Sequence, residues 1–172
     1  MKYKTGCFVG KFLPPHVGHL SVIDKALREC ENVVVVLAES PNRSQKLCEK
    51  AGFPYFSPQK RLEWMKKHYK NNKNMKFIFF DETGIEPSDL KTWSEKFKTQ
   101  IKNIDAKYAD ESYRNLNETY FPECKFVPID RDKIAIHGTD IRENRENIKF
   151  MIPEGKKEVE DYFKKTIDKK GE

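Results

Sequence analysis

The sequence lacks any long hydrophobic run. Its apolar stretches are only a few residues long, whereas a helix that crosses a bilayer needs about 20 apolar residues. The first residues, Met1-Lys2-Tyr3-Lys4, are positively charged, but neither an apolar stretch nor a small-residue cleavage site of the kind found in secretory signal peptides follows them. We therefore expect a cytoplasmic protein that is neither secreted nor embedded in a membrane.

Closely spaced cysteines are lacking as well. Cys7, Cys30, Cys48 and Cys124 are scattered through the chain and include no C-x-x-C pair. This spacing favours neither a zinc site nor a disulfide framework. Reduced thiols agree with a cytoplasmic location, because structural disulfides are rare in that compartment.

The chain also has no Pro/Ser-rich linker, no low-complexity tract and no fixed-period repeat. Its 172 residues suit one domain, which we expect to span residues 1–172. Lys and Arg outnumber Asp and Glu by 33 to 27, a net charge of +6, which suits phosphate-bearing ligands. Acidic residues are interspersed among the basic ones, and no nucleic-acid-binding motif is present, so a nucleic-acid partner is not expected.

Apolar runs and helical patterns alternate along the chain. The runs at 5–9, 33–37 and 76–80 predict strands, and apolar spacing at 19–30, 59–69 and 90–101 predicts helices between them. The run V-V-V-V-L at 33–37 must be covered on both faces, as in a parallel sheet. Weaker patterns predict strands at 104–108 and 125–127 and helices at 113–120, from 139, and at 156–167, while residues 40–46 are expected to form a loop. The fold class is therefore α/β, a Rossmann-like open parallel sheet with helices on both faces.

The loop after the first strand is the first candidate for a ligand site, because such sheets bind ligands at the carboxyl ends of their strands. It spans residues 10–19, G-K-F-L-P-P-H-V-G-H. Gly18 allows His19 to begin a helix, whose N-terminal amides favour an anion. His16 and His19 are spaced so that both can donate to one phosphate, and Lys11 adds a cation. We expect this loop to bind a phosphate group.

Two other interpretations of this loop are excluded. The spacing from Gly6 to Gly10-Lys11 is one residue short of a Walker loop, and Phe12 occupies the position of the magnesium-binding Ser or Thr. A metal site formed by His16 and His19 lacks a third ligand nearby.

The loop resembles the signature G-K-F-x-P-x-H-x-G-H of the nucleotidyltransferase superfamily, whose H-x-G-H motif binds and activates a nucleoside triphosphate. A second motif of that superfamily, I-S-x-T-x-x-R, resembles I-H-G-T-D-I-R at residues 136–142. Ile136, Thr139 and Arg142 match this pattern, while His137 replaces the usual serine. We expect a helix to begin at Thr139.

Other segments resemble the nicotinamide mononucleotide (NMN) adenylyltransferase domain of the bacterial NadR type. These are the Q-x-R-L-x-W-M pattern at 59–65, Gly84-Ile85, the W-S-E that opens a helix at 93–95, and F-M-I-P at 150–153. The similarity covers roughly residues 4–155. The kinase and DNA-binding domains that accompany this domain in such proteins have no room in this sequence.

The resemblance implies transfer of AMP from ATP to NMN, which gives NAD and pyrophosphate. It implies catalytic roles for His16, His19, Lys11 and Arg142, with His19 nearest the α-phosphate. Mg²⁺ would accompany ATP, held mainly by substrate oxygens and water, so we expect no metal ligand from the protein. Substrate contacts are further expected at Gly10, Phe12, Leu13, Gly18, Arg43, Glu82, Thr83, Gly84, Ile85, Trp93, Ala109, Asp110, Glu111, Ile136, His137 and Thr139.

Several of these assignments have alternatives. Trp93 is the candidate to stack on the cationic nicotinamide ring, or else a core residue. Arg43 reaches a phosphate or is a solvated loop residue. The function itself has two alternatives: another nucleotidyltransferase, such as phosphopantetheine adenylyltransferase or a cytidylyltransferase, or a non-catalytic sensor of NAD or ATP. The choice between NMN and its deamidated acid stays open, and a homo-oligomer is compatible with the sequence.

Overall fold

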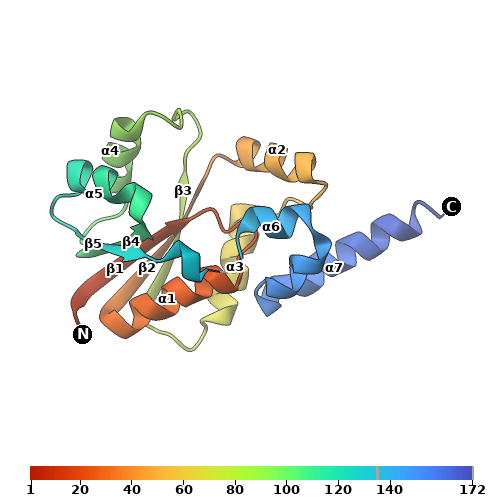
Figure 1. The fold of residues 1–172 in the computed structure, drawn as a ribbon, viewed down its shortest axis with the longest axis horizontal. Coiled ribbons are helices and arrows are strands. Elements are labelled where there is room, and N and C mark those ends of the chain that lie inside the picture. Colours follow the sequence, from red (N-terminus) through yellow and green to blue (C-terminus); the bar gives the residue numbers. More distant parts are fainter. Residues whose placement is uncertain (135, 172) are drawn as a thin grey trace.

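The protein is a five-stranded parallel sheet flanked by helices (Figure 1). The computed structural model describes residues 1–134 and 136–171. The strand order is β3-β2-β1-β4-β5, with β1 at Tyr3–Gly10, β2 at Cys30–Glu39, β3 at Met75–Asp81, β4 at Ala106–Asp110 and β5 at Lys125–Ile129. All neighbouring strands are parallel, which confirms the predicted fold class.

Seven α-helices are present in the described residues. They are α1 at Val17–Glu29, α2 at Pro41–Ala51, α3 at Pro58–His68, α4 at Leu90–Gln100, α5 at Arg114–Tyr120, α6 at Gly138–Glu143 and α7 at Pro153–Asp168. Short 3₁₀ turns lie at Glu111–Tyr113, Arg131–Lys133 and Arg145–Phe150. Within this part of the chain, no helix combines the length and apolar character that crossing a bilayer requires.

Strand β2 explains why the sheet has helices on both faces. Val33, Val35 and Leu37 belong to the core beneath α1, α3 and α7, whereas Val34 and Val36 belong to a second core with residues of α4. Side chains of a strand alternate between its faces, so an uninterrupted apolar strand demands two cores. Figure 1 shows α4 and α5 on one side of the sheet and α1 and α3 on the other.

The structure corrects three expected boundaries. Residues 40–46 do not form a loop, because helix α2 begins at Pro41; proline at the first helical position is favoured since its missing N–H would be unpaired there. Helix α1 begins at Val17, not His19, with His16 as its N-cap. Helix α6 likewise begins at Gly138, not Thr139.

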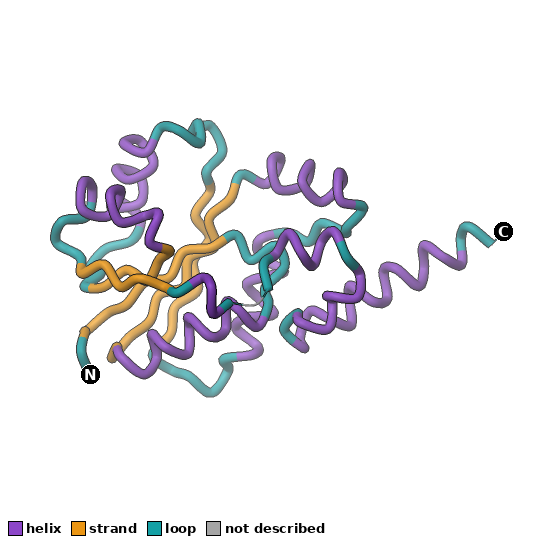
Figure 2. Tube along the Cα trace, in the orientation of Figure 1, coloured by secondary structure: helices purple, strands orange, loops and turns teal. Residues whose placement is uncertain are grey.

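The sheet places the predicted functional segments together. All strands are parallel, so the loops that follow them leave the sheet at one edge (Figure 2). These loops contain the H-x-G-H segment after β1, the start of α2 after β2, and residues 82–89 after β3. The candidate site must therefore be sought at this edge.

Candidate functional site

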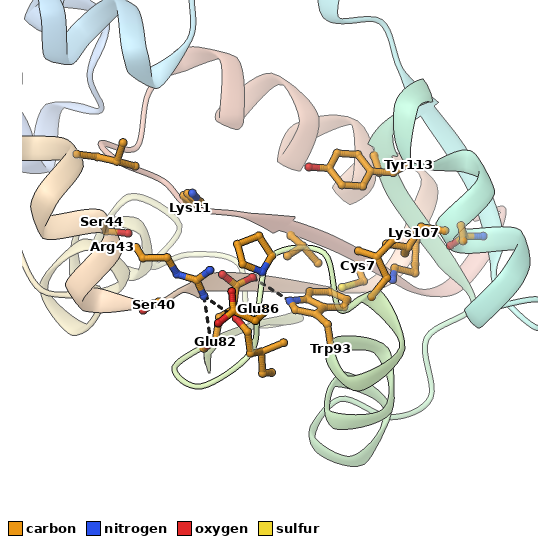
Figure 3. A pocket seen from close by; sticks show the side chains of 18 of the residues that line it. Cys7, Lys11, Ser40, Arg43, Ser44, Glu82, Glu86, Trp93, Lys107 and Tyr113 are labelled. Atoms are coloured by element: carbon orange, nitrogen blue, oxygen red, sulfur yellow. Dashed lines mark hydrogen bonds between the residues drawn. The ribbon is translucent and has the colours of Figure 1, made fainter.

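A cavity of about 610 Å³ lies at the carboxyl ends of the strands, on the face of the sheet that carries α4 and α5. Figure 3 shows its lining side chains converging from several elements. Six of the predicted site residues line it: Lys11, Arg43, Glu82, Ile85, Trp93 and Ala109. The volume is within the range of small-molecule sites, which is about 300–1,000 Å³.

The two histidines lie beside one another at the end of β1. Their ring centroids are 3.7 Å apart. The Nδ1 of His16 accepts from the Gly18 amide at 3.1 Å, and the Nδ1 of His19 accepts from the His16 amide at 3.2 Å. In a neutral imidazole one nitrogen accepts and the other donates. Both Nε2 atoms therefore carry the proton and are able to donate a hydrogen bond to a phosphate oxygen.

Burial keeps both imidazoles neutral. Loss of solvent, reinforced by the neighbouring His137, lowers the pKa of His16 from 6.5 to about 4. Burial and the nearby His16 hold the pKa of His19 well below its ordinary value. At neutral pH the pair thus supplies hydrogen-bond donors without a full positive charge.

The aromatic ring of Phe12 packs against the histidine pair. Phe12 is fully buried, adopts a positive φ of 48°, and packs edge-on against His19 with ring centroids 4.7 Å apart. A Cβ at Gly10 would lie only 3.1 Å from the Phe12 ring. Gly10 thus admits this ring close to the backbone, and the loop holds His19 in place through packing.

Arg61 of α3 holds the same loop through its backbone. Its guanidinium donates to the carbonyl oxygens of Lys11 and Phe12 and forms a buried ion pair with Glu39 at the end of β2. Tyr55 donates a further hydrogen bond to Glu39 at 2.8 Å. The loop conformation therefore depends on a buried charged group that the sequence analysis did not identify.

The second predicted motif, residues 136–142, contacts the H-x-G-H loop. Arg142 of α6 donates to the carbonyl oxygen of Leu13 and to Thr139 Oγ1. The backbones approach closely here, since a Cβ at Gly138 would lie 2.8 Å from the Leu13 oxygen. Ile136 is buried, and the His137 amide, at the start of α6, donates to Asp140 at 2.8 Å. The motif thus completes the wall beside the H-x-G-H loop.

The loop after β3 forms another wall of the cavity. The Trp93 indole N–H donates to Glu82 at 2.8 Å, and its ring stacks on Phe97 with centroids 4.9 Å apart. Arg43 donates to the carbonyl oxygens of Glu82 and Ile85, so its guanidinium links α2 to this loop rather than being fully solvated. Trp93 packs against the core and also lines the cavity. Its expected stacking on a nicotinamide ring stays a prediction.

The remaining residues of this loop, Thr83 and Gly84, are exposed. The Thr83 amide donates to Asp81 at 2.9 Å, and Gly84 has a positive φ of 82°. Both residues lie in the turn that ends β3, and neither belongs to the cavity lining. Their expected backbone contacts with the substrate stay a prediction.

Residues at the end of β4 are divided between the cavity and solvent. Ala109 lines the cavity. Asp110 accepts from the Ser112 amide at 3.0 Å, and Glu111 pairs with Arg114 on the surface. Asp110 and Glu111 thus have partners within the protein, and the substrate contacts expected of these three residues stay a prediction.

The structure separates the candidate residues into two neighbouring groups. Lys11 and Ala109 belong to the cavity lining, whereas His16, His19 and Arg142 do not and lie at the adjoining end of β1. The sequence analysis missed several lining residues, including Cys7, Ser44, Lys107 and Tyr113. Side chains alternate between the two faces of a strand, and this alternation in β1 and β4 could have identified Cys7 and Lys107. The two residues are partners in the strand register and face the same side of the sheet.

The described residues contain no group of three or more His, Cys, Asp or Glu side chains that could hold a metal ion. Mg²⁺ usually retains several waters and takes the rest of its ligands from substrate phosphates. The expectation that the substrate itself would hold Mg²⁺ stays a prediction.

Comparisons with known proteins find similarity over most of the chain. The chain is 28% identical over 173 residues to the trifunctional NAD biosynthesis/regulator protein NadR of Salmonella typhimurium, covering 94% of this chain and 41% of that protein. It is 37% identical over 84 residues to phosphopantetheine adenylyltransferase of Campylobacter hominis, covering 48% of this chain and 47% of that protein. The chain thus spans less than half the length of these relatives.

The fold also matches a known structure. The NadR protein in complex with NR superposes with a TM-score of 0.69 at 22% identity, over 88% of this chain and 43% of that one. The family model that describes cytidylyltransferase-like proteins matches residues 7–145, which include both motifs and every strand except the beginning of β1. This chain is therefore a member of the cytidylyltransferase-like family of nucleotidyltransferases.

Proposed function

We propose that this protein is an NMN adenylyltransferase, which transfers AMP from ATP to NMN and releases pyrophosphate. One observation carries the proposal: the backbone fixes both Nδ1 atoms of His16 and His19 as acceptors, so that two Nε2–H donors remain for a triphosphate. Catalysis of phosphoryl-type transfer depends mainly on positioning and charge stabilisation, for which such fixed donors are suited.

In this reaction a phosphate oxygen of NMN attacks the α-phosphorus of ATP. A new P–O bond forms as the bond from the α-phosphorus to the bridging oxygen breaks, and that electron pair leaves with pyrophosphate. The NMN phosphate is ionised at neutral pH, so no general base is required. His19 would donate to the α-phosphate, while His16, Lys11 and Arg142 would stabilise the charge that develops on the leaving group.

Mg²⁺ would supply further charge neutralisation on the triphosphate. The protein's own contribution is to position the nucleotide. The loop carbonyls are held by Arg61 and Arg142, so the donors do not need to reorganise when the substrate arrives. This preorganisation is the main source of electrostatic stabilisation in enzymes.

The acceptor is assigned to the cavity beside this loop. The indole N–H of Trp93 is bonded to Glu82, which orients the ring. The flat face of such an aromatic ring attracts a cationic pyridinium ring. The similarity to NadR over most of the chain also supports NMN as the acceptor.

Phosphopantetheine is the second candidate acceptor. The local identity of 37% to a phosphopantetheine adenylyltransferase favours it, as do Leu47, Leu90 and Leu116 in the cavity lining, because an uncharged flexible arm fits an apolar wall. This alternative keeps the roles of the two motifs and changes only the acceptor.

The test is transfer of label from ATP carrying ³²P at the α-position. Purified protein with MgCl₂ is offered NMN, nicotinic acid mononucleotide or phosphopantetheine in parallel, and the products are separated by chromatography. Labelled NAD is expected with NMN. Label only on phosphopantetheine would assign the protein to that acceptor, and ATP binding without transfer to any acceptor would favour a sensor.

A further inference from the structure

Lys107 is a buried lysine in the wall of the cavity. It lies in β4, opposite Cys7 of β1 in the strand register, and only 6% of it is exposed. Its side chain lines the cavity, and Figure 3 shows it at the same end of the cavity as Cys7 and Trp93, away from Ser40 and Arg43. A charged amine is therefore part of the cavity wall beside Trp93.

The Lys107 ammonium has aromatic neighbours but no acidic partner. Its Nζ lies 3.3 Å from the centroid of the Phe121 ring and 4.7 Å from that of Phe97. Glu123, the carboxylate that acts on its charge, forms an ion pair with Lys98 instead, and no carboxylate of the described residues forms a hydrogen bond or ion pair with Lys107. A buried ammonium is costly unless it is paired, and aromatic faces offset only part of that cost. The arrangement leaves this cation able to pair with an anionic group that enters the cavity.

Its position relative to Trp93 indicates which part of a ligand would meet it. The Nζ of Lys107 lies 5.7 Å from the centroid of the Trp93 ring. One face of Trp93 is already covered by Phe97, and its indole nitrogen is directed to Glu82. A pyridine ring beside Trp93 would thus bring its ring substituent within reach of Lys107. Both NMN and its acid carry that substituent at the same ring position, as a carboxamide and a carboxylate respectively.

We propose that Lys107 is a specificity-determining residue that allows the cavity to accept nicotinic acid mononucleotide in addition to NMN. This inference rests on the proposed adenylyltransferase function. A carboxylate forms a charge-assisted hydrogen bond with the ammonium, whereas the carboxamide offers only a neutral carbonyl oxygen. The acid also supplies the carboxylate partner that this ammonium lacks among the described residues.

The test compares the two mononucleotides in the label-transfer assay with wild-type protein and Lys107→Met. Methionine keeps an unbranched side chain among the aromatic rings and removes the charge. We expect kcat/KM for the acid to fall about tenfold or more, while kcat/KM for NMN changes less than about threefold. Lys107→Gln is measured in parallel in case one variant fails to fold. Lys76→Met, at an exposed lysine of β3 outside the cavity lining, is the matched control.

The pH dependence provides an independent measurement. Burial lowers the pKa of Lys107 to about 8, so the preference for the acid over NMN should decline as pH rises through about 8 and the ammonium loses its proton. The groups that act on it from neighbouring elements are Cys7, Cys124, Glu123 and Lys98. Burial raises the pKa of both thiols. All four groups remain in Lys107→Met. The preference of this variant for the acid over NMN should therefore not decline as the pH rises through about 8.

Three outcomes separate this inference from the proposed function. Loss confined to the acid in Lys107→Met supports the inference. Wild-type transfer to NMN but not to the acid, or an equal loss with both acceptors, overturns the inference while the proposed function stands. Transfer to neither mononucleotide by the wild-type protein overturns both.

Discussion

The guanidinium of Arg142 donates to the carbonyl oxygen of Leu13, a residue 129 positions earlier in the chain. A second donor of the same group bonds to Thr139 Oγ1 at 3.2 Å. A guanidinium has five N–H donors in a fixed plane, so others remain for a phosphate. Arg142 thus joins the two sequence motifs and keeps donors that a phosphate could use.

Replacing Arg142 by lysine tests this double role. Lysine keeps the positive charge but lacks the planar arrangement of donors that can hold the Leu13 carbonyl and a phosphate together. We expect kcat/KM for ATP to fall at least about tenfold, the scale of a lost charged hydrogen bond, measured by steady-state kinetics. Arg28→Lys, on the exposed side of α1, is the control and should be unchanged. Equal kinetics for both variants would contradict the role of Arg142.

The close approach at Gly138 makes a second prediction. An alanine Cβ would lie 2.8 Å from the Leu13 carbonyl oxygen and 3.1 Å from Arg142 Nη1, so the backbone must shift. We expect Gly138→Ala to lower the free energy of unfolding by about 1–3 kcal/mol, as overpacking does, and to weaken ATP binding. Urea denaturation measures the first effect. In Gly171→Ala, where the nearest atom would be 3.7 Å away, neither quantity should change.

The buried pair of Arg61 and Glu39 predicts a non-additive result. Arg61→Met leaves Glu39 buried without its cation and should cost about 3–5 kcal/mol of unfolding free energy. Adding Glu39→Met removes the isolated carboxylate, so the double variant should be more stable than Arg61→Met alone. Both variants should bind ATP weakly, because the carbonyls of Lys11 and Phe12 lose their donor. A double variant as unstable as the sum of both single changes would contradict this account.

Substitution of His19 tests the phosphate donors. In His19→Asn the amide oxygen can replace Nδ1 as acceptor for the His16 N–H, while the Nε2–H donor is lost. We expect kcat to fall about a hundredfold or more, the effect of removing one donor from an oxyanion site. The measurement is kcat with saturating ATP, and thermal unfolding checks that the variant is folded. Near-normal turnover would exclude His19 from the reaction.

The lowered pKa of His16 predicts an acid-sensitive fold. The pKa of His16 is about 4 in the folded protein, whereas it is near 6.5 in the unfolded chain. The free energy of unfolding therefore has its full value, as far as His16 is concerned, above pH 6.5. It decreases by about 3 kcal/mol through protonation of this group as the pH falls to 4 and below. Urea unfolding across this range, compared with His16→Asn, isolates the contribution. Asparagine can still cap α1, so the variant should show a shallower decline.

Much of the fold could be predicted from local patterns. The β-branched run in β2 and the apolar helical spacing in α1 are determined by neighbouring residues, and both elements lie near their expected positions. Helix α2 was missed because its residues are mostly polar, although Ser40 followed by Pro41 is a helix start signal. The starts of α1 and α6 were misplaced because histidine N-caps replace the usual short polar residues.

The two motifs, the parallel α/β sheet and the candidate phosphate loop follow from the sequence by itself, because each depends on residue types at short, fixed spacing. The tertiary structure alone decided that Arg61 and Arg142 hold the loop carbonyls, and that Lys107 faces a cavity instead of solvent. Such contacts join residues far apart in the chain, and a buried lysine or arginine looks like a surface one until the packing around it is known.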